Sequence, residues 1–431
     1  MGYSKLKQIN VTMIQGIQSG GGLYDLEGNQ KKIGKWIEQD KFFKAIKQVT
    51  YTGEYNINSM KVGKWDIMFT KSIDQPYQYM QILHEYKEYS GGGSYDQQGY
   101  QKKIGKWIEL DNFFSLIKQI TYNGEYNING MKVGGWDMWF QRLFGDKYEH
   151  IGGGFYDQEG NQKKIGKWVD LDEKFETLNE ITYIGEYNTN GMKVCRWDIL
   201  NRNKQIGGGS YDQEGNQKMI GNWIQLDKEF YHLKEVTYNG EYNLNGIKIG
   251  RWDTVYCKYE EKEYKLIGGG FYDQQGNQKK IGKWLELDER FNYERQLIYQ
   301  GEYNMNGAKV GRWDIMYFIY SSMEYKQIGG GSYEQEGNEK KIGKWIELDQ
   351  YFNSNQSFYK GEYNMNGMKV GRWDIMYRKF GREYIQMQIN IRISNIVEAD
   401  YLIQKEISLE SGLRLHNPMR SHRMVNTMQM V

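Results

Sequence analysis

The sequence predicts an all-β protein, an elongated and curved repeat sheet of about twelve antiparallel hairpins. The first observation is that twelve of the thirteen tryptophans recur in one phrase, glycine and a basic residue before tryptophan, or a close variant. The second is the regular spacing of these tryptophans, and the third is a turn sequence between runs of β-forming residues. The repeat tryptophans are Trp36, Trp65, Trp107, Trp136, Trp168, Trp197, Trp223, Trp252, Trp284, Trp313, Trp345 and Trp373.

The spacing divides the chain into six long repeats, each with an A half and a B half. The step from the A to the B tryptophan, as from Trp36 to Trp65, is identical in five repeats and shorter by one position in the last. The step to the next repeat varies, and it is longest from Trp65 to Trp107. A constant step indicates a rigid connection, and a variable step indicates a surface loop. The predicted segments are a lead-in at 1–19, repeats at 20–90, 91–151, 152–206, 207–267, 268–328 and 329–389, and a non-repeat tail at 390–431, a short helix followed by disorder.

The third repeat illustrates the expected hairpins. In its A half, the turn residues Asp157 and Gly160 separate two short β-rich runs. In its B half, Asn190-Gly191 lies between two further β-rich runs, which is the strongest short signal for a hairpin. Each long repeat is therefore expected to hold four strands, which gives 24 strands in the six repeats.

Alternation along the strands places glycines and large aromatic residues on one face of the sheet. In the last repeat, Gly371, Trp373, Ile375 and Tyr377 share such a face. A ring can lie over the bare backbone of a glycine on the neighbouring strand and shield it. The opposite face carries a mixed apolar stripe, and we expect the A-to-B connections to cover it, for example through Phe113, Phe114, Leu116 and Ile117.

A six-bladed β-propeller is the alternative fold, because six units of four strands are also typical of that architecture. The similarity of the A and B halves at a constant step favours the repeat sheet instead. The variable step between repeats favours the repeat sheet as well.

Composition excludes some classes of function. The net charge is +2, from 57 basic and 55 acidic residues, which gives no broad electrostatic footprint for nucleic acid. Two cysteines, Cys195 and Cys257, cannot build a disulfide framework, so a reducing compartment fits. No apolar run is typical of a signal peptide or long enough to span a bilayer. We therefore expect an intracellular protein that does not bind nucleic acid.

Residues 299–313, with the sequence YQGEYNMNGAKVGRW, resemble a unit of the MORN-repeat proteins. That unit is a short hairpin built on Tyr-x-Gly, a glycine turn, a lysine and Gly-x-Trp or Gly-x-Gly. The A halves resemble a variant opened by Gly-Gly-Gly-Ser/Phe-Tyr-Asp, and the resemblance covers roughly residues 20–378. The spacing here is longer, and tryptophan stands where many members have glycine.

The resemblance implies a ribbon of hairpins that serves attachment or dimerisation at membranes or on the cytoskeleton. A cytoplasmic or cytoskeleton-associated location follows from the same resemblance. Family members with enzymatic activity carry a separate catalytic domain, for which this chain leaves no room.

Lysine pairs recur after the A turns, and they allow two interpretations. One is a basic row that contacts anionic lipid headgroups or an acidic partner. The other, which we favour, is a solvated strand start neutralised by acidic turn residues such as Asp157 and Glu159, because alternation points the two lysines to opposite faces. The candidate anion-contacting residues are Lys32, Lys103, Lys164, Lys280 and Lys341.

No nucleophile and base recur together, and no histidine lies within the repeated motif. We therefore predict no enzymatic activity, no catalytic residue, no metal and no cofactor. The leading hypothesis is a non-enzymatic scaffold that binds protein partners through its aromatic face or its edge strands. The alternative is peripheral membrane attachment through anionic phospholipids. Exposed terminal strands also allow a homodimer through edge pairing.

Overall fold

A computed structural model describes residues 20–41, 43, 48–70, 78–79, 81–84, 87–143, 145, 147–258, 263–349, 352, 357–377 and 385–386. The predicted lead-in at 1–19 and the predicted tail at 390–431, with its short helix and disorder, lie outside these residues. The chain divides into two compact units. The first unit comprises the residues up to Gly343 together with Asn364–Met368. The second unit comprises Lys344–Tyr363 together with the residues from Lys369 onward.

Each repeat contributes four main strands. Repeat 1 has β1 (Gly21–Tyr24), β2 (Lys32–Gln39), β3 (Gln48–Tyr55) and β4 (Lys61–Thr70). Repeat 2 has β8 (Gly92–Tyr95), β9 (Lys103–Leu110), β10 (Gln119–Tyr126) and β11 (Lys132–Gln141). Repeat 3 has β12 (Glu149–Tyr156), β13 (Lys164–Leu171), β14 (Ile181–Tyr187) and β15 (Lys193–Asn201).

The later repeats follow the same pattern. Repeat 4 has β16 (Lys204–Tyr211), β17 (Met219–Leu226), β18 (Glu235–Tyr242) and β19 (Lys248–Cys257). Repeat 5 has β20 (Tyr264–Tyr272), β21 (Lys280–Leu287), β22 (Leu297–Tyr303) and β23 (Lys309–Ile319). Repeat 6 has β24 (Glu324–Tyr333), β25 (Lys341–Leu348), β26 (Phe358–Tyr363) and β27 (Lys369–Tyr377).

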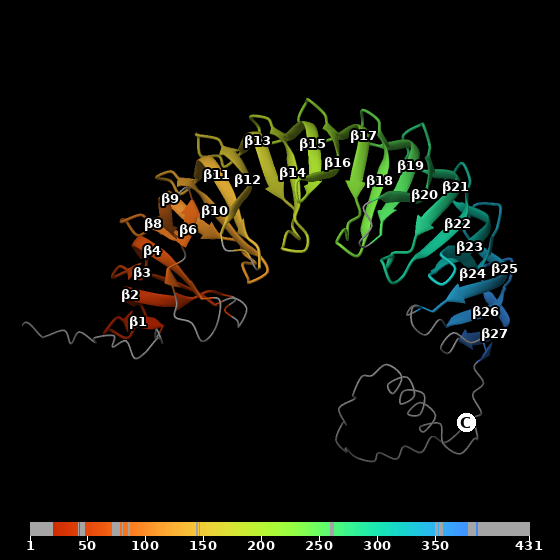
Figure 1. The fold of residues 1–431 in the computed structure, drawn as a ribbon, viewed down its shortest axis with the longest axis horizontal. Helices are drawn as coiled ribbons and strands as arrows, with labels where there is room; N and C mark the ends of the chain where they lie inside the picture. Colours follow the sequence, from red (N-terminus) through yellow and green to blue (C-terminus); the bar gives the residue numbers. More distant parts are fainter. Residues whose placement is uncertain are drawn as a thin grey trace, which may run out of the picture. The chain divides into compact units, whose positions relative to one another are not determined.

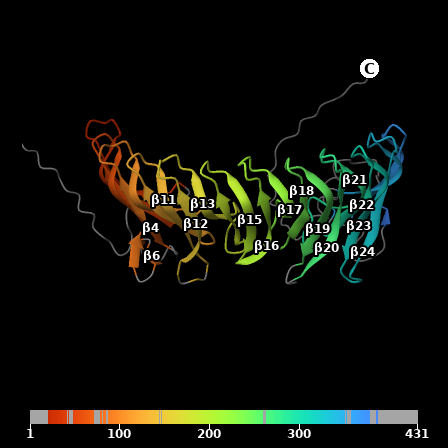
Figure 2. The same ribbon diagram turned by 90° about the horizontal axis from the view of Figure 1, so that it is seen from above.

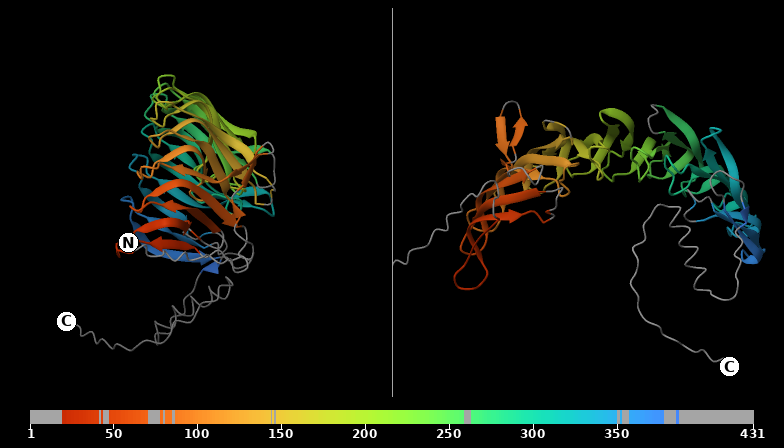
Figure 3. Two further views of the ribbon diagram at one scale, coloured as in Figure 1. Left: turned by 90° about the vertical axis from the view of Figure 1, so that its left-hand side faces the viewer. Right: turned by 60° about the horizontal axis from the view of Figure 1, so that its bottom comes forward.

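Four further strands are much shorter than the main ones. They are β5 (Gln78–Tyr79), β6 (Gln81–His84), β7 (Lys87–Ser90) and β28 (Ile385–Gln386). Strands β6 and β7 form a separate hairpin in the long connection between repeats 1 and 2. In the right-hand view of Figure 3 this hairpin, in orange, stands off from the neighbouring strands.

From β1 to β24 each main strand pairs antiparallel with its neighbours in the chain, and β26 pairs in the same way with β27, which confirms the predicted all-β class. Pairing also continues from one repeat to the next, through β4–β8, β11–β12, β15–β16, β19–β20 and β23–β24. Figures 1 and 2 show this succession of labelled strands in chain order. In a propeller each blade is a separate sheet, so this continuous, open pairing rules out the propeller alternative.

The two hairpin turns of each repeat lie at the same edge of the sheet, which we call the turn edge. In each B turn a single asparagine side chain holds the backbone; the Oδ1 of Asn127, for example, accepts hydrogen bonds from the amides of Asn129 and Met131. The A-to-B loops lie at the opposite edge, which we call the loop edge. The tight turns, with each B turn held by an asparagine side chain, therefore lie at one edge of the sheet, and the longer loops lie at the other.

The loop edge has its own small cores. Phe114, from the A-to-B loop of repeat 2, is fully buried against Val49, Ile67 and Phe69 of repeat 1. Phe175, Phe230 and Phe291 are buried in the corresponding clusters of the following repeats. Each loop thus covers strands of the repeat before it, which couples neighbouring repeats.

The side that these loops cover differs from the prediction. Along β4, Ile67 and Phe69 share a face with Trp65, because residues alternate along a strand. Phe114 therefore packs on the tryptophan face near the loop edge, and not on the opposite face. Phe155 and Ile184, at strand positions that alternate away from Trp168 and Trp197, remain exposed.

Candidate functional site

The tryptophan side chains lie on glycines of the neighbouring strand. An atom added at the Cβ position of Gly124 would come within 2.1 Å of the Trp136 ring, and at Gly240 within 2.2 Å of the Trp252 ring. The A-half rings lie in the same way; the Trp168 ring would be 2.5 Å from such an atom on Gly154. Only glycine permits a ring this close to the backbone, and the ring in turn removes the glycine from water.

These rings form a continuous ladder with tyrosines. From Tyr24 to Tyr333, tryptophan and tyrosine alternate with ring centroids 5.0–6.5 Å apart and interplanar angles of 78–88°. Edge-to-face contacts of this kind add stabilisation beyond the area that the rings bury. The indole Nε1 of Trp168 also donates a hydrogen bond to the carbonyl of Phe155, at 3.0 Å. The repeat tryptophans are thus engaged in packing along the sheet.

A charged centre lies beside the ladder of rings in every repeat except repeat 4. In repeat 2 the carboxylate of Glu109 pairs with Lys103, lies 3.2 Å from the Nζ of Lys132, and accepts a hydrogen bond of 2.7 Å from the hydroxyl of Tyr126. The Nζ of Lys132 also lies 3.7 Å from the centroid of the Trp136 ring. Burial acts to raise the pKa of Glu109, but the two lysines and Tyr126 outweigh it and hold this pKa below the usual 4.5.

The same centre contains the candidate anion-contacting lysines. Lys32, Lys103 and Lys280 pair with Glu38, Glu109 and Glu286, and Lys164 lies 2.5 Å from Asp170. Lys341 occupies the equivalent position at the start of β25. For the four pairs, contact with an external anion would require the lysine to leave an internal carboxylate. The sequence suggested acidic turn residues as their partners, whereas the partners are carboxylates of the same strand.

Repeat 4 departs from this arrangement. Met219 stands where the other repeats have the first lysine, and Gln225 stands where they have the carboxylate. Gln225 donates to the sulfur of Met219 at 3.1 Å and accepts a hydrogen bond of 2.9 Å from Tyr242. Lys248 keeps its place over Trp252, 3.8 Å from the ring centroid. Burial and the neighbouring Lys280 lower the pKa of Lys248 to about 8.

A groove of about 880 Å³ runs over this face from repeat 2 to repeat 4. Its lining includes Glu109 and Asp170 together with Lys132, Lys164 and Lys193. Both signs of charge therefore alternate along it, between aromatic rings. Such a lining suits a ligand with mixed polar and aromatic contacts better than one with a single charge.

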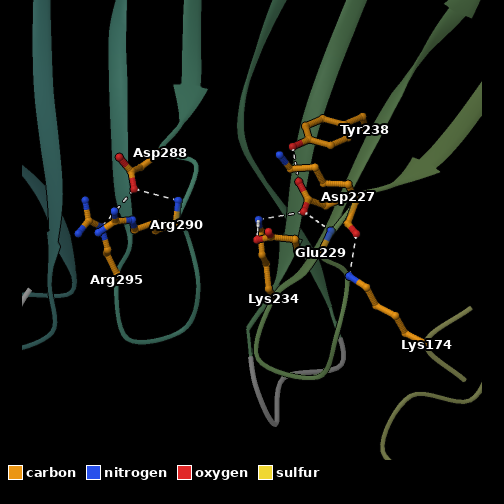
Figure 4. A network of polar contacts seen from close by, with 9 residues as sticks. Lys174, Asp227, Glu229, Lys234, Tyr238, Asp288, Arg290 and Arg295 are labelled. Atoms are coloured by element: carbon orange, nitrogen blue, oxygen red, sulfur yellow. Dashed lines mark hydrogen bonds and ion pairs between the residues drawn. The ribbon is translucent and has the colours of Figure 1, made fainter. Parts of the chain in front are cut away.

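A second row of polar centres lies at the loop edge (Figure 4). The carboxylate of Asp227 accepts hydrogen bonds from the hydroxyl of Tyr238 at 2.7 Å and the amide of Glu229 at 2.9 Å, and it lies 2.9 Å from the Nζ of Lys234. In the next repeat the Nε of Arg295 donates to Asp288 at 3.1 Å. Burial acts to raise the pKa of Asp227, but Lys234 and the hydrogen bonds outweigh it and lower the pKa. These contacts fix the loop that carries the buried Phe230.

The turn edge presents a row of apolar side chains. The residue after the bracing asparagine is Ile57, Ile128, Leu244, Met305 or Met365 in five of the six B turns, with 73–83% of its surface exposed. In repeat 3 the residue is Thr189. The A turns carry glutamine or leucine at the second position, as with Gln158 in repeat 3. Sequence reasoning identified these turns but missed the row, although its signal was present in the repeated Asn-x-Asn-Gly phrase.

Among the described residues, no group of three or more histidine, cysteine, aspartate or glutamate residues is arranged to hold a metal ion. No helix in this part of the chain is long and apolar enough to cross a membrane.

Comparison with known proteins gives similarities in structure only. No family model matches the chain. No curated protein matches it either. Solved structures that match include a protein from Lactobacillus plantarum, at 9% identity and a TM-score of 0.17, covering 82% of this chain and 83% of that one. Another is the alpha-L-arabinanase of Penicillium chrysogenum, at 10% identity and a TM-score of 0.17, covering 79% and 90%. The alpha-L-arabinofuranosidase of Fusarium graminearum matches at 8% identity and a TM-score of 0.17, covering 80% and 92%.

These matches correct one prediction from the sequence. The absence of enzymatic activity was predicted, yet enzymes, an arabinanase and an arabinofuranosidase, are among the similar structures. We therefore withdraw that prediction. At TM-scores of 0.17 the matches transfer no activity, substrate or site residue to this chain. The resemblance to MORN-repeat proteins stays a prediction.

Proposed function

We propose that this chain is a repeat scaffold that binds a partner protein along its turn edge. The observation that carries the proposal is the row of exposed apolar side chains at the tips of the B turns, Ile57, Ile128, Leu244, Met305 and Met365. Large apolar side chains that recur on one edge are typical of an interaction surface. Four strands per repeat, at roughly 4.8 Å each, give a spacing of roughly 19 Å between tips.

The bracing of the turns supports this proposal. The Oδ1 of Asn243 accepts hydrogen bonds from Asn245 at 2.9 Å and Ile247 at 3.1 Å, and so fixes the loop that carries Leu244. A tip held in this way loses little conformational entropy when it binds. Exposed carboxylates such as Glu159 and Glu214 lie in the A turns of the same edge, and they supply the polar rim that protein interfaces commonly have.

The test replaces the five tip residues with serine in one variant. The matched control replaces the exposed A-turn glutamines Gln97, Gln158, Gln213, Gln274 and Gln335 with serine. A photo-crosslinking residue at position 189, the B-turn position of repeat 3 that neither variant changes, then reports the proteins bound at this edge in extract of the source cells. We expect loss of specific crosslinks only in the tip variant. Identical crosslinked proteins in both variants would contradict the proposal.

An anionic membrane is the second candidate partner, and one observation favours it. In four of the five pairs the first lysine packs beside the glycine of a B turn; Lys102 lies against Gly130, and Lys279 lies against Gly307. Basic side chains beside apolar tips are typical of surfaces that bind anionic lipid. Flotation with vesicles containing phosphatidylserine tests this candidate. Equal flotation with neutral vesicles, or none at all, would eliminate it.

A further inference from the structure

The missing carboxylate in repeat 4 sets Lys248 apart from its five counterparts. Its ammonium lies 3.8 Å from the centroid of the Trp252 ring, within the range of 3.7–4.1 Å found in the other repeats. Each counterpart also has an internal carboxylate, at 2.9 Å from Lys61, 3.2 Å from Lys132 and 3.4 Å from Lys309. The remaining distances are 3.9 Å from Lys193 and 2.9 Å from Lys369. Among the described residues, Lys248 alone of the six has no such ion pair.

We propose that repeat 4 binds a carboxylate group from outside the chain beside Gln225, the residue that replaces Glu or Asp of the other repeats, with Lys248 as its ion-pair partner. The site lies on the tryptophan face, so it does not depend on the turn-edge function. The carboxylate can belong to a small organic acid or to an acidic side chain of a partner protein.

The surroundings of Lys248 fit this ligand. Trp252, Tyr238, Tyr242 and Tyr272 surround the ammonium, with ring centroids 3.8–6.0 Å from it. These rings orient the ammonium without neutralising it, since cation–π contacts leave the N–H donors available. Gln225 adds a second donor, because its amide nitrogen otherwise contacts only the weak acceptor sulfur of Met219. The apolar walls favour a carboxylate that carries an apolar body.

The electrostatics point the same way. Burial and the charge of Lys280 lower the pKa of Lys248 to about 8, so the ammonium is costly to hold in this place. A bound carboxylate would relieve that cost, and the pKa of Lys248 would rise on binding. In repeat 2 Lys132 already has Glu109, so an added carboxylate should change its pKa little.

The test is NMR of the intact chain after reductive ¹³C-methylation of its lysines, with the Lys248 signal assigned by its loss in Lys248→Arg. We expect acetate to raise the pKa of Lys248 in a saturable way and to leave Lys132 unchanged. Gln225→Glu supplies an internal carboxylate as in the other repeats. In this variant the pKa of Lys248 should be higher than in the unaltered chain without ligand, and it should be insensitive to acetate.

A gain-of-site variant makes the test independent of repeat 4. Lys103→Met combined with Glu109→Gln gives repeat 2 the residues of repeat 4, and Lys132 should then acquire the response to acetate. A short glutamate-rich peptide, used in parallel, distinguishes the sources. Binding at least tenfold tighter than acetate indicates a protein partner, and equal binding indicates a small acid.

Three results would overturn the proposal. The first is no saturable response of Lys248 to either probe. The second is an equal response at Lys132 in the unaltered chain, which would mean general screening by the added salt. The third is an unchanged response in Gln225→Glu.

Discussion

Repeats 2 and 4 have the same backbone and aromatic packing but different charges. Gly124 lies under Trp136 and Gly240 under Trp252, with nearly equal clearance. Beside these rings, repeat 2 holds Lys103, Glu109 and Lys132, whereas repeat 4 holds Met219, Gln225 and Lys248. The ring-on-glycine contact therefore does not need the charged centre. The charges can vary between repeats because the packing already fixes the strands.

The largest expected effect tests the part that the two repeats share. Gly124→Ala and Gly240→Ala each place a Cβ about where the indole ring lies, so each should destabilise the fold by about 3 kcal/mol. Urea denaturation followed by tryptophan fluorescence measures both. Gly105→Ala is the control. Its Cβ strains the backbone but meets no ring, because nothing lies within 4 Å of its Cβ position. A clear difference between the 124 and 240 variants would break the claim that the packing is equivalent.

The next effect tests the part that differs. Glu109→Gln leaves Lys103 and Lys132 without a counter-ion in a partly buried place, and it should cost about 2–3 kcal/mol. Glu125→Gln is the matched control on the neighbouring strand. Trp136 donates its hydrogen bond of 3.3 Å to the backbone carbonyl of Glu125, which this substitution leaves in place. Urea denaturation again gives the difference. If the two variants lose the same stability, the charged centre of repeat 2 contributes nothing specific.

Acidification should separate the repeats as well. The folded-state pKa of Glu109 lies below its usual 4.5, so its stabilising contribution is complete above that value and is lost as pH falls through the folded pKa. Met219→Lys with Gln225→Glu adds such a centre to repeat 4. The double variant should gain about 1 kcal/mol at pH 7, and it should lose that gain as the pH falls through the folded-state pKa of the new glutamate, below the usual 4.5. Thermal midpoints at pH 7 and in acid measure this, and a gain retained in acid would contradict it.

The smallest effect concerns repeat 3, which has a cysteine at a backbone position where repeats 2 and 4 have glycine. Cys195 adopts φ +58° where Gly134 and Gly250 have +63° and +62°. This left-handed conformation is strained for a residue with a Cβ, so Cys195→Gly should stabilise the protein by about 0.5 kcal/mol. Cys195→Ser keeps the strain and serves as the control. A loss of stability in Cys195→Gly would mean that the contact of the sulfur with Gln213 outweighs the strain.

Part of the candidate site could be read from particular residues. The constant step between the A and B tryptophans and the Asn-Gly turns predicted the hairpins, and alternation predicted that Trp136 would face a glycine on the next strand. Alternation could not reveal that Glu109 contacts both Lys103 and Lys132, because Lys132 lies two strands away, on the far side of β10. Gln225 and Met219 matter because they replace the carboxylate and the first lysine of this contact in repeat 4, which is evident only once the contact is known.

The sequence by itself determined the strands, their turns and the face of each tryptophan, because these depend on local backbone preferences and on a period of two. The tertiary structure decided which carboxylate meets which lysine, which side the buried Phe114 covers, and that Lys248 has no internal counter-ion. These features depend on the register between strands that are distant in the chain. In β10, for example, the register shifts at a β-bulge between Asn123 and Glu125, beside the Gly124 that the Trp136 ring covers, and neither feature is encoded within a single strand.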